Sequence, residues 1–238
     1  MTATPATETP GSTEGTERSE STGSYEPTAL TVPSRSRDRA RYDRETVHAI
    51  LDEAYICHLG FVRDGAPVVL PTLFARVGES LYMHGSTGSR PLLAAGRTDP
   101  GLPVCVTVTH VDGLVLARSA FHHSLNYRSV VVHGTAHQVT DEAECRTALD
   151  AMVDSVAPGR SADIRPANAR ELAATAVIRV DLTEVSAKLR TGPSNDDAED
   201  LGLPHWAGVI PVAPVYGTPV PAADLAPGIA LPDYLAAL

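Results

Sequence analysis

The sequence has almost no lysine and few cysteines. Lys188 is its only lysine, so arginine carries nearly all of the positive charge, and the formal net charge over 238 residues is −10. Such an acidic chain is a poor general binder of nucleic acid, because phosphate backbones are held mainly by Lys and Arg. The three cysteines, Cys57, Cys105 and Cys145, form no CxxC pair, which argues against a disulfide framework and a structural zinc site.

Long apolar runs are also missing. No stretch approaches the roughly 20 residues of a membrane-spanning helix, and the chain does not open with a basic segment followed by an apolar one. We therefore expect a cytoplasmic protein with reduced thiols and no membrane partner.

Large apolar side chains are scarce in the first 34 residues, which are rich in Thr, Ser, Glu, Pro and Gly. Such a segment buries too little surface to offset its chain entropy. We predict a disordered tail over residues 1–38, of which residues 1–34 can be deleted without loss of fold. Residues 39–212 form the predicted domain, and a Pro- and Ala-rich tail follows over residues 213–238.

Hydrophobic periodicity predicts a mainly β protein with peripheral helices. The N-cap Asp43 predicts a helix, and the period then changes from helical spacing to two. Strands are predicted over residues 55–63, 67–77, 80–84, 104–111, 114–120, 127–139 and 176–185. Asp-Gly pairs at 64–65 and 112–113 predict hairpin turns, and a small antiparallel barrel would close the strand edges.

A second helix is predicted with Thr140 as its cap. Its apolar residues recur at helical spacing, which indicates one buried face: Cys145, Ala148, Leu149, Met152, Val153 and Val156.

The first candidate site is the loop after the strand at 80–84. Gly85 to Gly88 lead to Ser89 and Arg90, and the unpaired N–H groups of a helix start suit an anion. Hydroxyls of Ser86 and Ser89 and the guanidinium of Arg90 would complete a phosphate cradle. An ordinary capped loop uses the same residue types and is an equally good reading.

Two further segments attract attention. The ribbon from Leu116 to Val130 is dense in polar side chains between apolar strands, and buried polar groups need partners that a polar ligand could supply. Pro71 lies inside the strand at 67–77, which implies an edge or a bulge that either presents backbone groups to a ligand or faces solvent. His122 and His123 would point to opposite sides of a strand, so a shared metal ion is not expected.

Taken together, these segments resemble the pyridoxamine 5′-phosphate oxidase-like superfamily of FMN-binding split barrels, in the flavin-nucleotide-binding branch related to nitroimidazole-resistance nitroreductases. The likeness covers about residues 39–212 and rests on the order of several short motifs: Ile56–Gly60, Val69–Thr72, Leu81–Arg90, Val104–Thr109 with Asp112–Leu114, Ala117–Val130, Ser186–Lys188 and Trp206–Val209. It implies a six-stranded antiparallel split barrel and a homodimer with FMN in each interface cleft.

The resemblance also implies roles for individual residues. The phosphate site falls on Ser86, Ser89 and Arg90, and the strand along the flavin ring falls on Leu70, Pro71 and Thr72. Further cofactor contacts fall on Asn126, Arg128 and Trp206, and His84 takes the position of a catalytic histidine beside the flavin.

These roles imply an FMN-dependent oxidoreductase that passes electrons from a reduced nicotinamide to a small nitro- or quinone-like substrate. A flavin- or haem-binding protein without turnover, and a reductase of the same fold that uses the deazaflavin F420, are the alternatives. Oxidation of pyridoxamine phosphate is not expected, because no Lys or Arg follows Arg190 to hold the substrate phosphate.

Overall fold

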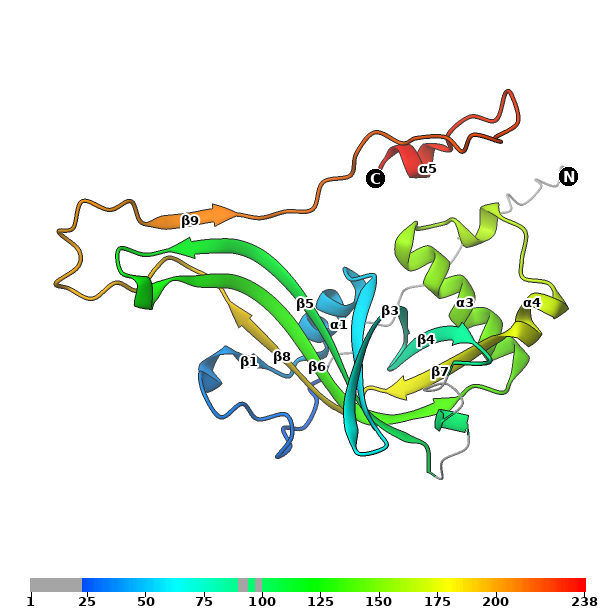
Figure 1. Ribbon diagram of the computed structural model, residues 1–238, viewed down its shortest axis with the longest axis horizontal. Coiled ribbons are helices and arrows are strands. Elements are labelled where there is room, and N and C mark those ends of the chain that lie inside the picture. Colours follow the sequence, from blue (N-terminus) through cyan, green and yellow to red (C-terminus); the bar gives the residue numbers. More distant parts are fainter. Residues whose placement is uncertain (1–22, 90–93, 97–99) are drawn as a thin grey trace, which may run out of the picture.

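The computed structural model describes residues 23–89, 94–96 and 100–238 as a twisted antiparallel sheet with peripheral helices (Figure 1). The strands are β1 (Ala40–Arg41), β2 (Ile56–Arg63), β3 (Ala66–Val77), β4 (Ser80–Ser86), β5 (Leu102–Leu116), β6 (Ser124–Gln138), β7 (Thr175–Asp181), β8 (Glu184–Arg190) and β9 (Gly208–Pro211). The helices are α1 (Arg44–Asp52), α3 (Glu142–Val156), α4 (Ala169–Ala174) and α5 (Asp233–Ala236).

Six strands close into a ring, in the order β6-β7-β4-β3-β2-β5 and back to β6 through the β5–β6 pairing. The other three strands extend the sheet beyond the ring. Apolar side chains that alternate along the strands fill its interior, with Phe74, Leu81 and Val106 almost fully buried. The predicted six-stranded antiparallel split barrel is confirmed.

Only one of the two predicted Asp-Gly hairpins exists. Asp64 and Gly65 have φ values of 51° and 77° and join β2 to β3, as a two-residue hairpin turn requires. The turn predicted at Asp112-Gly113 is wrong, because β5 runs straight through it and pairs with β6 on both sides, with only a shift of register between Val111 and Gly113. The extra residue is accommodated as a bulge rather than a reversal of the chain.

The helices begin close to the predicted positions. Asp43 caps α1 by accepting a hydrogen bond from the Thr46 N–H at 2.9 Å. The cap of α3 is Asp141 rather than Thr140. The strand predicted over residues 176–185 is two strands, β7 and β8, which separate at Leu182 and Thr183.

The N-terminal segment is anchored to the domain at Tyr25. Tyr25 is only 4% exposed, its hydroxyl lies 3.0 Å from His48 Nε2 and donates to Glu79 at 2.9 Å, and the Arg44 guanidinium lies 4.5 Å from its ring centroid. The predicted tail therefore has an aromatic anchor at Tyr25, overlooked among polar neighbours, while most of residues 26–38 are exposed. Residues 1–22 lie outside the described residues.

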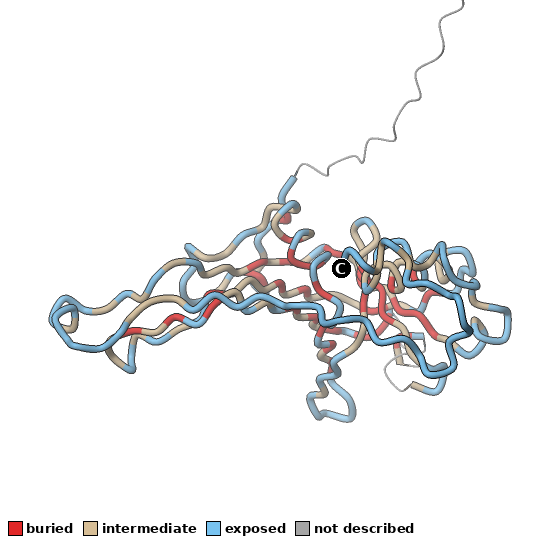
Figure 2. The backbone as a smooth tube through the Cα atoms, turned by 90° about the horizontal axis from the view of Figure 1, so that it is seen from above, coloured by how far each residue is buried: buried red, intermediate tan, exposed pale blue. Residues whose placement is uncertain are grey.

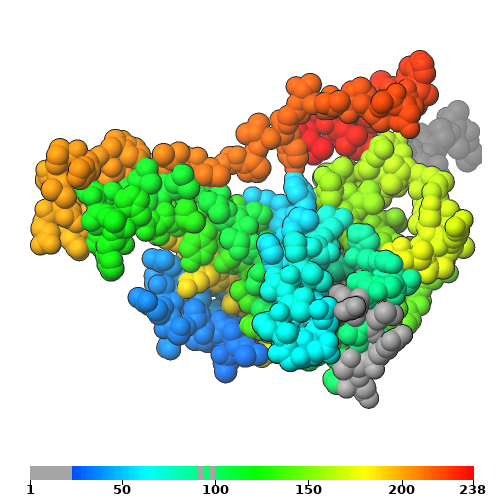
Figure 3. Space-filling model, in the orientation of Figure 1, coloured from blue at the N-terminus to red at the C-terminus, as the bar shows by residue number. Residues whose placement is uncertain are grey.

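The ends of β5 and β6, together with β9, form an arm that projects from the barrel (Figures 1 and 2). Buried residues concentrate where the ring meets α1 and α3, whereas the arm tip and the C-terminal segment are exposed (Figure 2). That segment runs from β9 back toward α3, where the Tyr234 hydroxyl donates to Asp163 (Figure 3). No helix among the described residues is long and apolar enough to cross a membrane.

Replacing Tyr25 with Ala should lower the free energy of unfolding by about 3–5 kcal/mol, because it empties an aromatic site in the core. Chemical denaturation of the full-length protein measures the difference. Leu30→Ala in the same segment is the control, since Leu30 is exposed and its loss should change stability by no more than about 0.5 kcal/mol. Equal, small effects for both variants would mean that the segment does not dock.

Candidate functional site

An opening in the barrel lies between β3 and β4. The two strands pair from Val77 and Ser80 only as far as Phe74 and Met83. Beyond this point β3 stays paired with β2, and β4 stays paired with β7. Two predicted site segments, Leu70 to Thr72 on β3 and the loop after Ser86 on β4, therefore lie on the separated parts of the two strands.

The free edge of β3 gives this opening its chemistry. Among the described residues, no strand pairs with β3 on the β4 side between Leu70 and Leu73. Peptide N–H and C=O groups on such an edge are available to a ligand. Leu70 and Pro71 are exposed and Thr72 is half-buried, so this edge is accessible.

The loop at the end of β4 is a tight turn. The N–H groups of Thr87, Gly88 and Ser89 donate to the Ala174 carbonyl, the Ser86 Oγ and the Ser86 carbonyl, respectively. These backbone donors are engaged within the chain, so in this conformation an anion would be met mainly by side-chain hydroxyls. Arg90, the predicted cation of this site, lies outside the described residues.

His84 lies two residues before Ser86, on the side of β4 that faces α3. Its Nδ1 is 3.1 Å from the Met152 Sδ, and burial lowers the pKa of the imidazole. It lines a cavity of about 600 Å³ between α3, the segment from α3 to α4, and the strand edges at Leu73 and Thr175. The structure thus places the predicted catalytic histidine next to the opening and in contact with a cavity.

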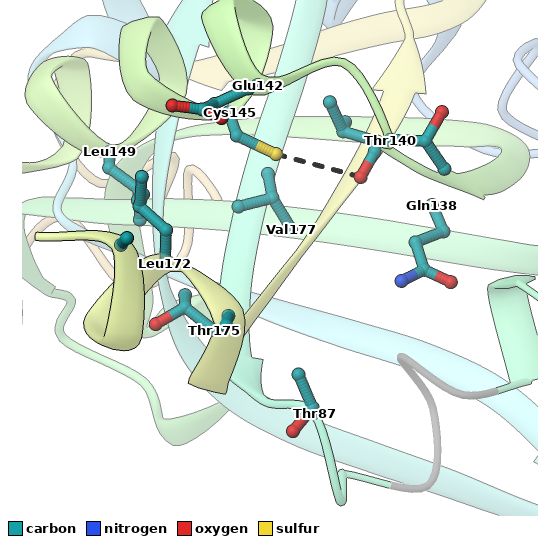
Figure 4. Close-up of a pocket in the computed structure, with 12 residues that line it drawn as sticks. Thr87, Gln138, Thr140, Glu142, Cys145, Leu149, Leu172, Thr175 and Val177 are labelled. Atoms are coloured by element: carbon teal, nitrogen blue, oxygen red, sulfur yellow. Dashed lines mark hydrogen bonds between the residues drawn. The ribbon is translucent and has the colours of Figure 1, made fainter.

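A second cavity, of about 430 Å³, lies between α3, α4 and the start of β7. Figure 4 shows Glu142, Cys145 and Leu149 on one side of it and Thr87 on the other. The Cys145 thiol donates to the Val139 carbonyl, and burial is the main cause that raises its pKa. A thiol held in this state is a poor nucleophile, so Cys145 serves packing rather than chemistry.

Arg128 does not lie near the loop after Ser86. The strand β6 ends at Gln138, and Arg128 lies ten positions before this end, which is about 33 Å along an extended strand. Its guanidinium donates to both Glu53 and Asp112 at 2.5–3.2 Å, and these hydrogen bonds raise its pKa. Arg128 thereby ties α1 to β5 and β6.

Asn126 and Trp206 also lie away from the opening, on the arm. The Asn126 side chain is buried, donates to the Gly192 carbonyl at 3.1 Å and accepts from Arg190 at 2.5 Å. Trp206 is 66% exposed, just before β9. The chain therefore brings His84, the β3 edge and the Ser86 loop near one another, but leaves Asn126, Arg128 and Trp206 apart.

Sequence reasoning missed the residues that line the larger cavity. Leu149, Val153 and Val156 were assigned to a packed helix face, yet they border open space, and Val156 is 43% exposed. Helical spacing of apolar residues was the available signal. It predicts which face needs apolar cover, but it does not say what covers it.

Comparison with known proteins agrees with this fold. A family profile described as pyridoxamine 5′-phosphate oxidase matches residues 43–189, and no curated protein matches the chain. The flavocytochrome Anf3 from Azotobacter vinelandii is 40% identical, with a TM-score of 0.82 over 89% of this chain and 97% of the other. The FAD- and haem-binding protein from Mycobacterium smegmatis is also 40% identical, with a TM-score of 0.78 over 84% and 96% of the two chains.

A more distant structure shares the fold alone. A candidate 5-nitroimidazole antibiotic resistance protein from Bacteroides thetaiotaomicron is 21% identical, with a TM-score of 0.51 over 63% of this chain and 85% of its own. The chain belongs to the pyridoxamine 5′-phosphate oxidase family.

Replacing Arg128 with Met should lower the free energy of unfolding by about 1 kcal/mol at pH 7. The figure is modest because Arg128, Glu53 and Asp112 are partly exposed, so solvent screens the ion pairs. The Arg128 hydrogen bond holds the pKa of Glu53 below its ordinary value, so this stabilisation is present above that value and is lost as pH falls. The free energies of unfolding of the two proteins should converge as pH falls well below the ordinary carboxyl pKa values of about 4; a difference that persists once both carboxyls are protonated would contradict the ion-pair explanation.

Proposed function

We propose that this protein is a redox protein that binds a flavin in the opening between β3 and β4, and a haem as its second cofactor. The observation that carries the flavin site is the unpaired edge of β3 between Leu70 and Leu73, which faces the Ser86 loop. Family membership supports the same placement, since two relatives at 40% identity are a flavocytochrome and an FAD- and haem-binding protein.

The residues present fit a flavin. An isoalloxazine ring has a polar edge of alternating donors and acceptors, and a free strand edge offers the complementary peptide groups. The exposed side chain of Leu70 gives the ring an apolar surface. Hydroxyls of Ser86 and Ser89 at the mouth of the opening suit a phosphate, and Arg90 follows them in the sequence.

The flavin we favour is FAD, on the strength of the relative that binds FAD and haem. FMN, the cofactor expected from the sequence, shares the ring and the first phosphate and would use the same edge and loop. The same site supports the expected activity, in which a reduced nicotinamide supplies electrons and a small nitro- or quinone-like compound receives them. Bound flavin supplies the redox chemistry, and the chain's own contribution is to hold the ring and shield one face from water.

We also propose that two copies form a homodimer around this site. Exposed apolar side chains lie on the outer surface of β2 and β3, the strand pair on one side of the opening: Ile56, Val62 and Val69. A monomer gains nothing from exposing such a patch, whereas a second copy would cover it. Analytical ultracentrifugation of the flavin-loaded protein tests this, and a monomer at micromolar concentration would contradict it.

Purified protein should be coloured by both cofactors, so absorption spectroscopy and mass analysis of the extracted cofactors test the proposed function. Flavin and haem bands together support it. Loss of the flavin band, with no uptake of FAD or FMN by the purified chain, would overturn it.

Ser86→Ala should weaken binding of FMN and FAD by about tenfold but leave riboflavin affinity unchanged, because one charge-assisted hydrogen bond to phosphate is worth about 1.5 kcal/mol. Fluorescence quenching of the three ligands in one buffer measures the ratios. Ser80→Ala is the control, since its hydroxyl bonds Asp181 at the other end of β4. If Ser86→Ala weakens riboflavin equally, Ser86 acts through the loop's shape and does not contact the phosphate.

A further inference from the structure

The larger cavity carries a surface that the fold leaves without a partner. Its wall on α3 is mainly apolar, with Leu149, Met152, Val153 and Val156 beside the carboxylate of Asp150, and the segment toward α4 adds Ile164, Pro166 and Ala167. Val156 and Ile164 are exposed although both line the cavity. At about 600 Å³ the space lies within the roughly 300–1,000 Å³ typical of cofactor sites.

One imidazole lines this largely apolar space. Among the described residues, His84 is the only histidine in the lining, and the lining holds no cysteine. The Nδ1 contact with the Met152 Sδ assigns the ring proton to Nδ1, because a thioether can only accept. No partner exists for His84 Nε2 among the described residues, so this nitrogen has a free lone pair for a metal.

Resting on the haem binding proposed above, we infer that this cavity is the haem site and that His84 Nε2 is an axial ligand of the iron. A flat macrocycle needs apolar walls on both faces, which α3 and the strand edge at Leu73 supply. The Nδ1 contact to Met152 would fix the ring orientation, as a second hydrogen bond does for most metal-bound histidines.

Charge at the rim fits the two carboxylates of a haem. Arg160 and Arg165 both line the cavity, and each now pairs with an acidic residue, Asp163 and Glu171 respectively. These pairs are exposed, so exchanging a side-chain carboxylate for a haem carboxylate would cost little.

Other histidines fit a haem ligand less well. His58 is exposed on the outer surface of β2, beside Pro71 on β3, where the sheet is open and no cavity is described. The cavity of about 430 Å³ contains no histidine. The His84 position would also place the two cofactors close together, because His84 lies two residues before Ser86 on β4 and shares the cavity with Leu73, at the free edge of β3.

Haemin titration of the full-length protein tests this placement, read by the Soret band and by electron paramagnetic resonance of the ferric iron. His84→Ala and His84→Gln should each weaken haem binding by more than about a hundredfold, beyond the 10–100-fold typical for partners that only orient a ligand. The circular dichroism of both apo-variants should match that of the apo-parent, and added imidazole should restore the low-spin signal in His84→Ala. His58→Ala should bind like the parent.

A second variant keeps the test independent of His84. Val153→Trp fills the cavity from α3 and should exclude haem while flavin binding persists. Haem binding with parental spectra in either His84 variant or in Val153→Trp, or its loss in His58→Ala alone, would overturn the placement and leave the proposed function standing. A parent protein that takes up flavin but no haem would overturn both the placement and the haem part of the proposed function.

Discussion

The site depends on one limit to strand pairing. One edge of β6 is shared, with β8 paired over residues 127–133 and β7 over residues 136–138. Because β7 also pairs along the whole of β4, β4 follows β7 away from β3 after Met83. The free edge of β3, the turn after Ser86 and the position of His84 are all consequences of this divergence.

Arginine residues hold the fold together through ion pairs, a role that the composition alone did not indicate. With Lys188 as the only lysine, arginines were natural candidates for anion binding. In the fold they join elements that are distant in the chain, as in Arg44 to Glu79, Arg76 to Asp52, Arg118 to Asp196 and Arg128 to Glu53. The guanidinium group binds a carboxylate with the same bidentate geometry as a phosphate. Residue type alone therefore does not distinguish an arginine in an ion pair from one that binds a ligand.

Local signals in the sequence predicted local structure well. The Asp64-Gly65 turn and the Asp43 cap were found because their conformations are set by neighbouring residues. Asp112-Gly113 carries the same signal, but pairing with β6 on both sides overrides it. Tyr25 was missed because its partners, His48 and Glu79, lie 23 and 54 positions away. The residues around the opening could be named from the order of motifs in the sequence. The cavity could not be predicted in this way, because it depends on where α3 packs in the fold.

The cavity also links cofactor binding to folding. Fully burying each of Leu149, Val153 and Val156 would contribute about 1.5–3 kcal/mol, and their sum is comparable to the 5–15 kcal/mol that holds a typical domain together. Without an occupant, part of that contribution is absent, since these side chains border open space. A ligand that binds only the folded chain stabilises it in proportion to the logarithm of its free concentration over its dissociation constant. The apolar stripe on α3 is therefore better explained as half of a binding site than as a poorly packed core, because only the first gives its exposed side chains a partner.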